Sequence, residues 1–179
     1  MRKSSILIQC GIFLAFVCNL AQAGHVMVDT TLVGLRIELH VLAAEPFFTK
    51  KEASSSKATE GMLIISGAKP LALDAKVHPN HHLVIHVFNT KTGKAITNAK
   101  VEMSFQSLDD KGIPAGSLIE VPVVVMQAIG KGIQSTHYGN NVVMPAGPYS
   151  VLLVVNGKNV NLKINVSDAQ SDSMGDMKM

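Results

Sequence analysis

Five histidines of this 179-residue chain occur in two short segments. His78, His81, His82 and His86 lie within the nine residues HPNHHLVIH, and His137 begins a HYG sequence further on. Imidazole is the most common metal ligand in proteins and suits copper, iron and zinc. This density of histidines predicts a metal site.

The spacing in the first segment predicts which histidines can share an ion. In a strand, His82 and His86 face the same side, but their Cα atoms would lie about 13 Å apart at a rise of 3.3 Å per residue. A turn at Pro79 would allow His78 to fold back toward His81 or His82, within the roughly 4 Å that two ligands of one ion require. We expect this local pair, and the alternative for each histidine is a solvated position in a surface loop.

We expect His137 in a glycine-rich loop, residues 130–139, between Met126 and Met144. Thioethers beside imidazoles favour Cu(I), although a methionine on an apolar strand more often fills a core. Copper or iron is the expected ion, with manganese or zinc possible. The predicted metal ligands are His137, His82, His86, His78 and Met126.

The first 23 residues have the pattern of a secretory signal peptide. Arg2 and Lys3 precede an apolar stretch, and the small-x-small sequence at residues 21–23 predicts cleavage after Ala23. We therefore expect a soluble, exported, periplasmic protein. Its apolar segments after residue 23 are all shorter than the roughly 20 residues of a membrane helix.

Cleavage would change the composition that matters for function. Cys10 and Cys18 both lie in the leader, so the remaining chain would have no thiolate ligand and no disulfide. Loss of Arg2 and Lys3 leaves 14 basic and 13 acidic residues from the original 16 and 13, a net charge of +1. A nearly neutral chain has no electrostatic footprint for nucleic acid, and none is expected as a partner.

Alternation of apolar and polar residues predicts an all-β domain over residues 24–166. Residues 50–60 read as a charged, serine-rich loop, and residues 167–179 as a disordered tail with methionine and aspartate. Short strands separated by turns favour an antiparallel, immunoglobulin-like β-sandwich of about eight or nine strands. The expected strands are 33–43, 62–66, 71–77, 82–89, 99–107, 118–128, 141–144, 149–156 and 161–166.

Two segments carry a resemblance to known families. The sequence THYGNNVVMPAGPYSVLLVV, residues 136–155, resembles the HYG-N-x-x-MP-x-G-x-Y-x-V signature of the periplasmic auxiliary proteins of bacterial ferrous iron transport. Residues 81–105 are similar to YtkA-like exported domains. The first resemblance implies a dimeric immunoglobulin-like sandwich that binds copper through Met and His, with iron or manganese nearby. His137 matches the family's HYG histidine, Met126 stands for its methionine, and His78 is nearest to its early histidine.

These observations predict a periplasmic metal-binding protein that assists copper or ferrous iron uptake, with an inner-membrane metal transporter as partner and a possible homodimer. We expect no enzyme activity, because no GxSxG, HExxH or phosphate-binding glycine motif occurs. The alternative is a β-sandwich interaction or accessory module of the cell envelope, which needs an exposed apolar patch or an open edge strand. A metal-dependent oxidase is a third, weaker hypothesis.

Overall fold

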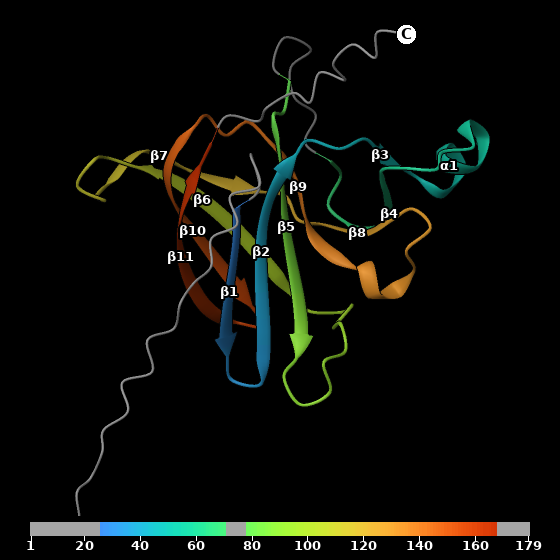
Figure 1. Cartoon of the computed structure of the whole chain (residues 1–179), viewed down its shortest axis with the longest axis horizontal. Coiled ribbons are helices and arrows are strands. Elements are labelled where there is room, and N and C mark those ends of the chain that lie inside the picture. Colours follow the sequence, from blue (N-terminus) through green and yellow to red (C-terminus); the bar gives the residue numbers. More distant parts are fainter. Residues whose placement is uncertain (1–25, 71–77, 168–179) are drawn as a thin grey trace, which may run out of the picture.

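The computed structural model describes residues 26–70 and 78–167, which form two β-sheets (Figure 1). The larger sheet has seven strands in the order β1-β2-β5-β9-β8-β4-β3, and the smaller has four in the order β11-β10-β6-β7. Neighbouring strands are antiparallel, except that β3 and β4 are parallel. The expected all-β architecture of two sheets is confirmed.

The strands have two to nine residues. In the larger sheet they are β1 (Val26–Leu32), β2 (Leu35–Ala43), β3 (Phe47–Phe48), β4 (Met62–Gly67), β5 (His81–Asn89), β8 (Val124–Ala128) and β9 (His137–Val142). In the smaller sheet they are β6 (Val101–Leu108), β7 (Pro114–Val121), β10 (Gly147–Val155) and β11 (Lys158–Val166). A helix, α1 (Lys50–Ser56), and a 3-10 turn, η1 (Ile133–Ser135), complete the described elements.

The main core lies between the two sheets and follows from alternation. On β2 and β5 every second side chain is apolar and nearly inaccessible to solvent, as expected for strands with one face in the core. These side chains join those of β6, β10 and β11 in one cluster. Its most deeply buried members include Ile37, Leu39, Val41, Leu83, Ile85, Val87, Phe105, Val151, Leu153 and Val155.

A second, smaller apolar cluster lies on the opposite face of the larger sheet. Met62, Val124 and Met126 are its buried members, and Phe47 packs against them. Phe47 belongs to β3, at the far edge of the sheet from β2, yet its ring lies 5.3 Å from that of His82 on β5. The larger sheet therefore curls back on itself, and the inside of the curl is this second cluster.

Two local expectations were wrong for identifiable reasons, and one strand had not been predicted. Residues 50–56 form a helix because Thr49 and Glu52 make a capping box, in which each side chain accepts a hydrogen bond from the other residue's backbone. The expected strand 118–128 is divided between β7 and β8 at Pro122, which has no N–H to donate to a sheet. Strand β1 was not expected at all.

Other sequence predictions fall outside the described residues. These are the signal peptide at 1–23, the strand at 71–77 and the tail, of which only residue 167 is described. In the ranges 26–70 and 78–167, no helix has both the length and the apolar character needed to cross a membrane.

Candidate metal centre

Three of the four predicted histidine ligands, His82, His86 and His137, come together on the outer face of the larger sheet. His82 and His86 share this face of β5, as alternation predicts, because Leu83 and Ile85 between them point into the main core. His137 is the first residue of β9 rather than part of a loop, so its expected position was wrong. Strand β9 inserts between β5 and β8 and thereby brings His137 beside the β5 histidines.

The closest approach is between His82 and His137. Their Nε2 atoms lie 3.4 Å apart and their ring centroids 5.6 Å apart. The exposed fractions are 0% for His82 and 2% for His137, so both imidazoles are removed from water. The ring of His86 lies on the other side of His137, at 5.5 Å between centroids.

Backbone carbonyl groups determine which ring nitrogen of His137 carries the hydrogen. Its Nδ1 lies 2.9 Å from the carbonyl oxygen of Ser135. A carbonyl oxygen only accepts hydrogen bonds, so Nδ1–H is the donor and the Nε2 of neutral His137 has a free lone pair. His86 is held in the same way, with Nδ1 3.2 Å from the carbonyl oxygen of Thr136. Metal-binding histidines are typically oriented by this kind of hydrogen bond.

The surroundings keep both buried imidazoles neutral. The pKa of His82 is lowered to about 4, first by burial and then by the nearby His137, while hydrogen bonding to Asn141 and Asn140 opposes the change. Burial also lowers the pKa of His137 to about 4, against the opposing hydrogen bond to Ser135. A neutral imidazole is the form that binds metals.

His86 links this pair to a fourth histidine. The ring of His40, on β2, lies 5.5 Å from the ring of His86 in an edge-to-face arrangement. The pKa of His86 is lowered by burial and then by the neighbouring His40. His40 Nε2 also lies 3.6 Å from a carboxylate oxygen of Glu38.

Met126 lies next to His137 across the sheet. The two residues are directly paired in β8 and β9, so their side chains share the outer face, with Cβ atoms about 4.5–5.5 Å apart. Met126 has no solvent-exposed surface and belongs to the second apolar cluster. A thioether therefore lies close to the buried imidazole pair.

A segment after β2 covers the buried pair. The ring of Phe47 packs edge-on against His82. The side chain of Asn141, which pairs with His82 in the sheet, donates to the carbonyl of Glu45 at 2.7 Å and accepts from its N–H at 3.3 Å. These contacts hold residues 45–47 over the site.

A glycine allows the strands that bear the two histidines to come together. A Cβ atom on Gly139 would lie only 1.8 Å from the carbonyl oxygen of Leu83. Gly139 pairs with Val84 on one side and Val124 on the other. Any larger residue would push β9 away from β5 and separate His137 from His82.

The geometry of the pair fits one metal ion between the two rings. Two nitrogens bound at about 2.05 Å with a tetrahedral angle are about 3.3–3.4 Å apart, whereas N–H···N hydrogen bonds are usually shorter. Within residues 26–70 and 78–167, no group of three or more His, Cys, Asp or Glu side chains is arranged to hold a metal. The Met126 thioether lies on the same face of the sheet as this pair.

The structure separates the predicted ligands into two groups. His82, His86, His137 and Met126 share one face, whereas His78 is exposed ahead of β5 and takes no part in the ring contacts of this group. His81 points to the opposite face of β5 from His82. The local pair of His78 with His81 or His82 is thus replaced by His82 with His137.

Sequence reasoning missed two residues of this face. His40 alternates with core residues of β2, and Met27 pairs directly with His40 from β1. The alternation in residues 33–43 does place His40 on the polar face, but only strand pairing shows that this face continues into that of His86.

No model of a known protein family and no curated protein sequence matches the chain.

Proposed function

We propose that this is an exported metal-binding protein whose cargo is Cu(I), held by His82, His137 and Met126. The observation that carries the proposal is the 3.4 Å separation of two buried Nε2 atoms, with the His137 lone pair directed at His82 by a backbone hydrogen bond. Two neutral imidazoles and a thioether are soft-to-borderline ligands suited to Cu(I). Ferrous iron is the other cargo that the sequence suggests.

The setting of the ligands supports monovalent copper in particular. The carboxylate of Glu38 approaches His40, at the far side of the histidine group from His82. Around Met126 the side chains are apolar, including Val124 and Met62. A low-dielectric site disfavours extra ionic charge, and Cu(I) with neutral ligands introduces the least.

Handling of metal at a membrane is part of the same proposal. The leader at residues 1–23 directs the chain to the periplasm, where an inner-membrane metal transporter would be the partner, and the protein would act as a monomer or homodimer. We also infer an immunoglobulin-like type for the sandwich. Tyr149, near the start of β10, donates from its hydroxyl to the carbonyl of Pro145 at 2.8 Å, a local contact similar to the tyrosine corner of such domains.

The test is a metal-binding titration of the purified full-length product. Cu(I), Fe(II) and Zn(II) are titrated separately against a competing chelator, in wild type and in three variants. We expect one Cu(I) per chain, lost in His137→Ala and weakened about tenfold or more in Met126→Leu, which conserves volume. His78→Ala is the control, because His78 lies outside the buried group, and it should bind like wild type.

The outcomes discriminate clearly between the cargoes. If the protein prefers Fe(II) and this binding depends on His137, then ferrous iron, and not copper, is the cargo. Binding of none of these ions at micromolar concentration would overturn the metal-carrier proposal. Circular dichroism of each variant distinguishes lost ligation from lost folding.

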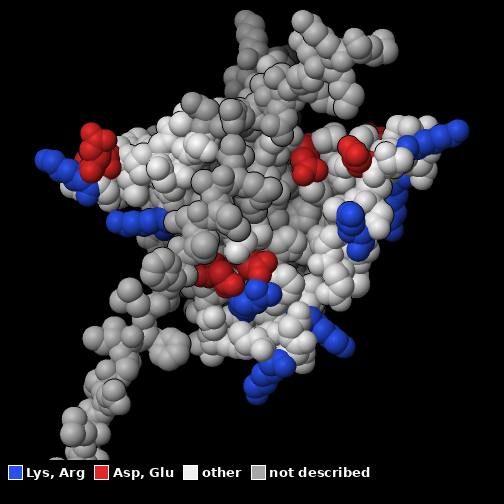
Figure 2. All heavy atoms as spheres, in the orientation of Figure 1, with Lys and Arg blue, Asp and Glu red and all other residues white. Residues whose placement is uncertain are grey.

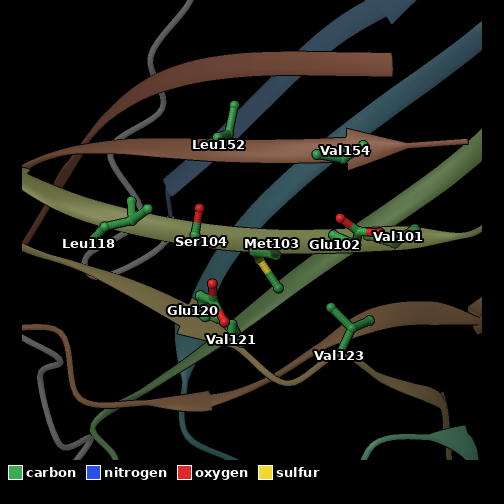
Figure 3. Close-up of a pocket in the computed structure, with 10 residues that line it drawn as sticks. All are labelled: Val101, Glu102, Met103, Ser104, Leu118, Glu120, Val121, Val123, Leu152 and Val154. Atoms are coloured by element: carbon green, nitrogen blue, oxygen red, sulfur yellow. The ribbon is translucent and has the colours of Figure 1, made fainter. Parts of the chain in front are cut away.

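A second candidate function, an interaction module, is favoured by the surface of the smaller sheet. A groove there is lined by apolar side chains including Leu118, Leu152 and Val154, with Glu102 and Glu120 beside them (Figure 3). Strand β7 ends this sheet within the described part of the chain. Such a strand offers pairing positions to another chain.

Charge substitution in this groove tests the second candidate independently of metal. Leu118 is 55% exposed, so Leu118→Lys should leave both the fold and Cu(I) binding unchanged. If the groove is the functional surface, this variant should lose a partner that wild type captures from an envelope extract. Equal capture by both proteins would count against the groove.

A further inference from the structure

Methionine and histidine side chains, two types that can bind metals, occupy adjacent strands of the larger sheet, one on each of five strands. They lie on the outer face in the spatial order β1, β2, β5, β9, β8. We call this set the ligand row, and it consists of Met27, His40, His86, His137 and Met126.

The neighbours in the ligand row are in contact or directly paired. Met27 pairs with His40 across β1 and β2, and His137 pairs with Met126 across β9 and β8. Between these ends, His86 lies 5.5 Å from both His40 and His137, measured between ring centroids. Each step is thus close to the strand spacing of about 4.8 Å.

The outer end of the row is exposed and the inner end is buried. Met27 is 58% exposed, the His40 side chain is 17% exposed, His137 is 2% exposed and Met126 is fully buried. The inner end is the proposed copper site, where His82 joins the row through its contact with His137. The row therefore connects solvent with a site that Phe47 covers.

Core packing does not explain the outer end of the row. The neighbours of Met27, Val26 and Val28, pack against the main core, whereas Met27 points away from it. A methionine on the exposed face of an edge strand contributes little to stability, but its thioether is accessible to a soft ion. Its direct pairing with His40 puts two suitable ligands at the surface.

Charged groups accompany the outer end. Glu38 contacts His40 and also forms an ion pair with Arg36, which in turn approaches Asp29 at 3.4 Å. Figure 2 shows acidic and basic side chains side by side on this face of β1 and β2. The two carboxylates outnumber the guanidinium, so the local charge is favourable for an approaching cation.

We infer that the ligand row is a transfer path along which Cu(I) moves between the surface and the buried site by exchange of ligands. The inference rests on the proposed function. At each step the incoming imidazole or thioether binds before the outgoing one is released, so the ion never loses all its ligands. Copper remains Cu(I) throughout, and no bond within the protein is made or broken.

Rates of copper transfer, rather than affinities, test this path. Cu(I) is presented as its coloured bicinchoninate complex, and stopped-flow absorbance follows its transfer to the apoprotein. We expect Met27→Leu with His40→Asn to slow transfer about tenfold, which corresponds to about 1.4 kcal/mol of activation free energy. The equilibrium affinity and the stoichiometry of one Cu(I) per chain should stay as in wild type.

Controls separate the path from the site. His78→Asn removes an exposed histidine outside the row and should transfer copper at the wild-type rate. Urea unfolding would reveal whether the double variant folds poorly. In that case Met27→Leu alone, at an exposed position, still tests the outer step of the path. His137→Asn should abolish binding at equilibrium and marks the effect of losing the site itself.

Each outcome has one meaning. Normal affinity with unchanged transfer rates in both outer variants would overturn the path and leave the copper site intact. A lost equilibrium binding site in the outer variants would also overturn it, because Met27 and His40 would then be site ligands. Failure of wild type to bind Cu(I) would overturn the proposed function itself.

Discussion

The Nε2 atoms of His82 and His137 lie 3.4 Å apart, although 55 residues separate the two histidines in the chain. The approach depends on β9 pairing beside β5 and on a glycine at position 139 that lets the two backbones come close. Because burial keeps both rings neutral, the protein presents two lone-pair donors in an apolar setting. This relationship underlies the proposed copper site.

Ring tautomers offer a direct check of the site in the metal-free protein. His137 and His86 should both carry hydrogen on Nδ1, because each Nδ1 faces a backbone carbonyl. Long-range nitrogen–proton NMR correlations distinguish the two tautomers, and a His137 protonated on Nε2 would contradict the geometry.

Stability of the metal-free protein should fall in mild acid. Folding lowers the pKa of His82 and of His137 from 6.5 to about 4, so the unfolded chain binds more protons between these values. The free energy of unfolding is therefore highest above about pH 6.5, where both histidines are neutral in the folded and the unfolded chain. As the pH falls toward 4, it decreases by roughly 1.4 kcal/mol per pH unit for each histidine.

Urea unfolding between about pH 7 and pH 4.5 measures this dependence, because the free energy of unfolding follows from the transition midpoint and slope. His78→Asn, at an exposed position outside the group, should show the same dependence as wild type. A free energy that does not change with pH over this range would mean that the two imidazoles are accessible to protons in the folded state.

Substitution of Gly139 should be among the most destabilising changes in the chain. An alanine Cβ would overlap the Leu83 carbonyl oxygen at 1.8 Å, so Gly139→Ala should cost more than about 3 kcal/mol or prevent folding. Gly93→Ala is the control: its φ is +66° but the space around it is open, and it should cost only about 1 kcal/mol. Comparable losses in urea unfolding for the two variants would contradict the close approach of β5 and β9.

The hydroxyl of Tyr138 should contribute measurably to stability. This buried group donates to the Ile96 carbonyl and accepts from the Ala99 N–H, both at 2.8 Å, and so attaches residues 96–99 to β9. Tyr138→Phe removes the hydroxyl and leaves the Ile96 carbonyl and the Ala99 N–H without this hydrogen-bond partner. The free energy of unfolding should fall by about 1–3 kcal/mol.

Tyr149→Phe is the matched control for this substitution, because its hydroxyl donates to one carbonyl only. It should cost less than Tyr138→Phe when both are measured by thermal or urea unfolding. The reverse order would show that the tether at residues 96–99 contributes little.

Local patterns in the sequence predicted much of the fold. Alternation located β2, β5, β6, β10 and β11 nearly to their observed bounds, and it placed His82 and His86 on one face. The Thr49-x-x-Glu52 capping box is another local signal and marks the start of α1. These features depend on contacts within a few residues, which is why periodicity and composition can reveal them.

The density of histidines in the sequence was enough to predict a candidate metal site, but only the tertiary structure decided which residues form it. His78 is four residues from His82 yet lies outside the group, whereas His137, Met126 and His40 enter it from other strands. Strand order and register are set by long-range backbone hydrogen bonding and by burial of the two sheet faces together. Such pairings join residues far apart in the chain, so no local pattern encodes which imidazoles will meet.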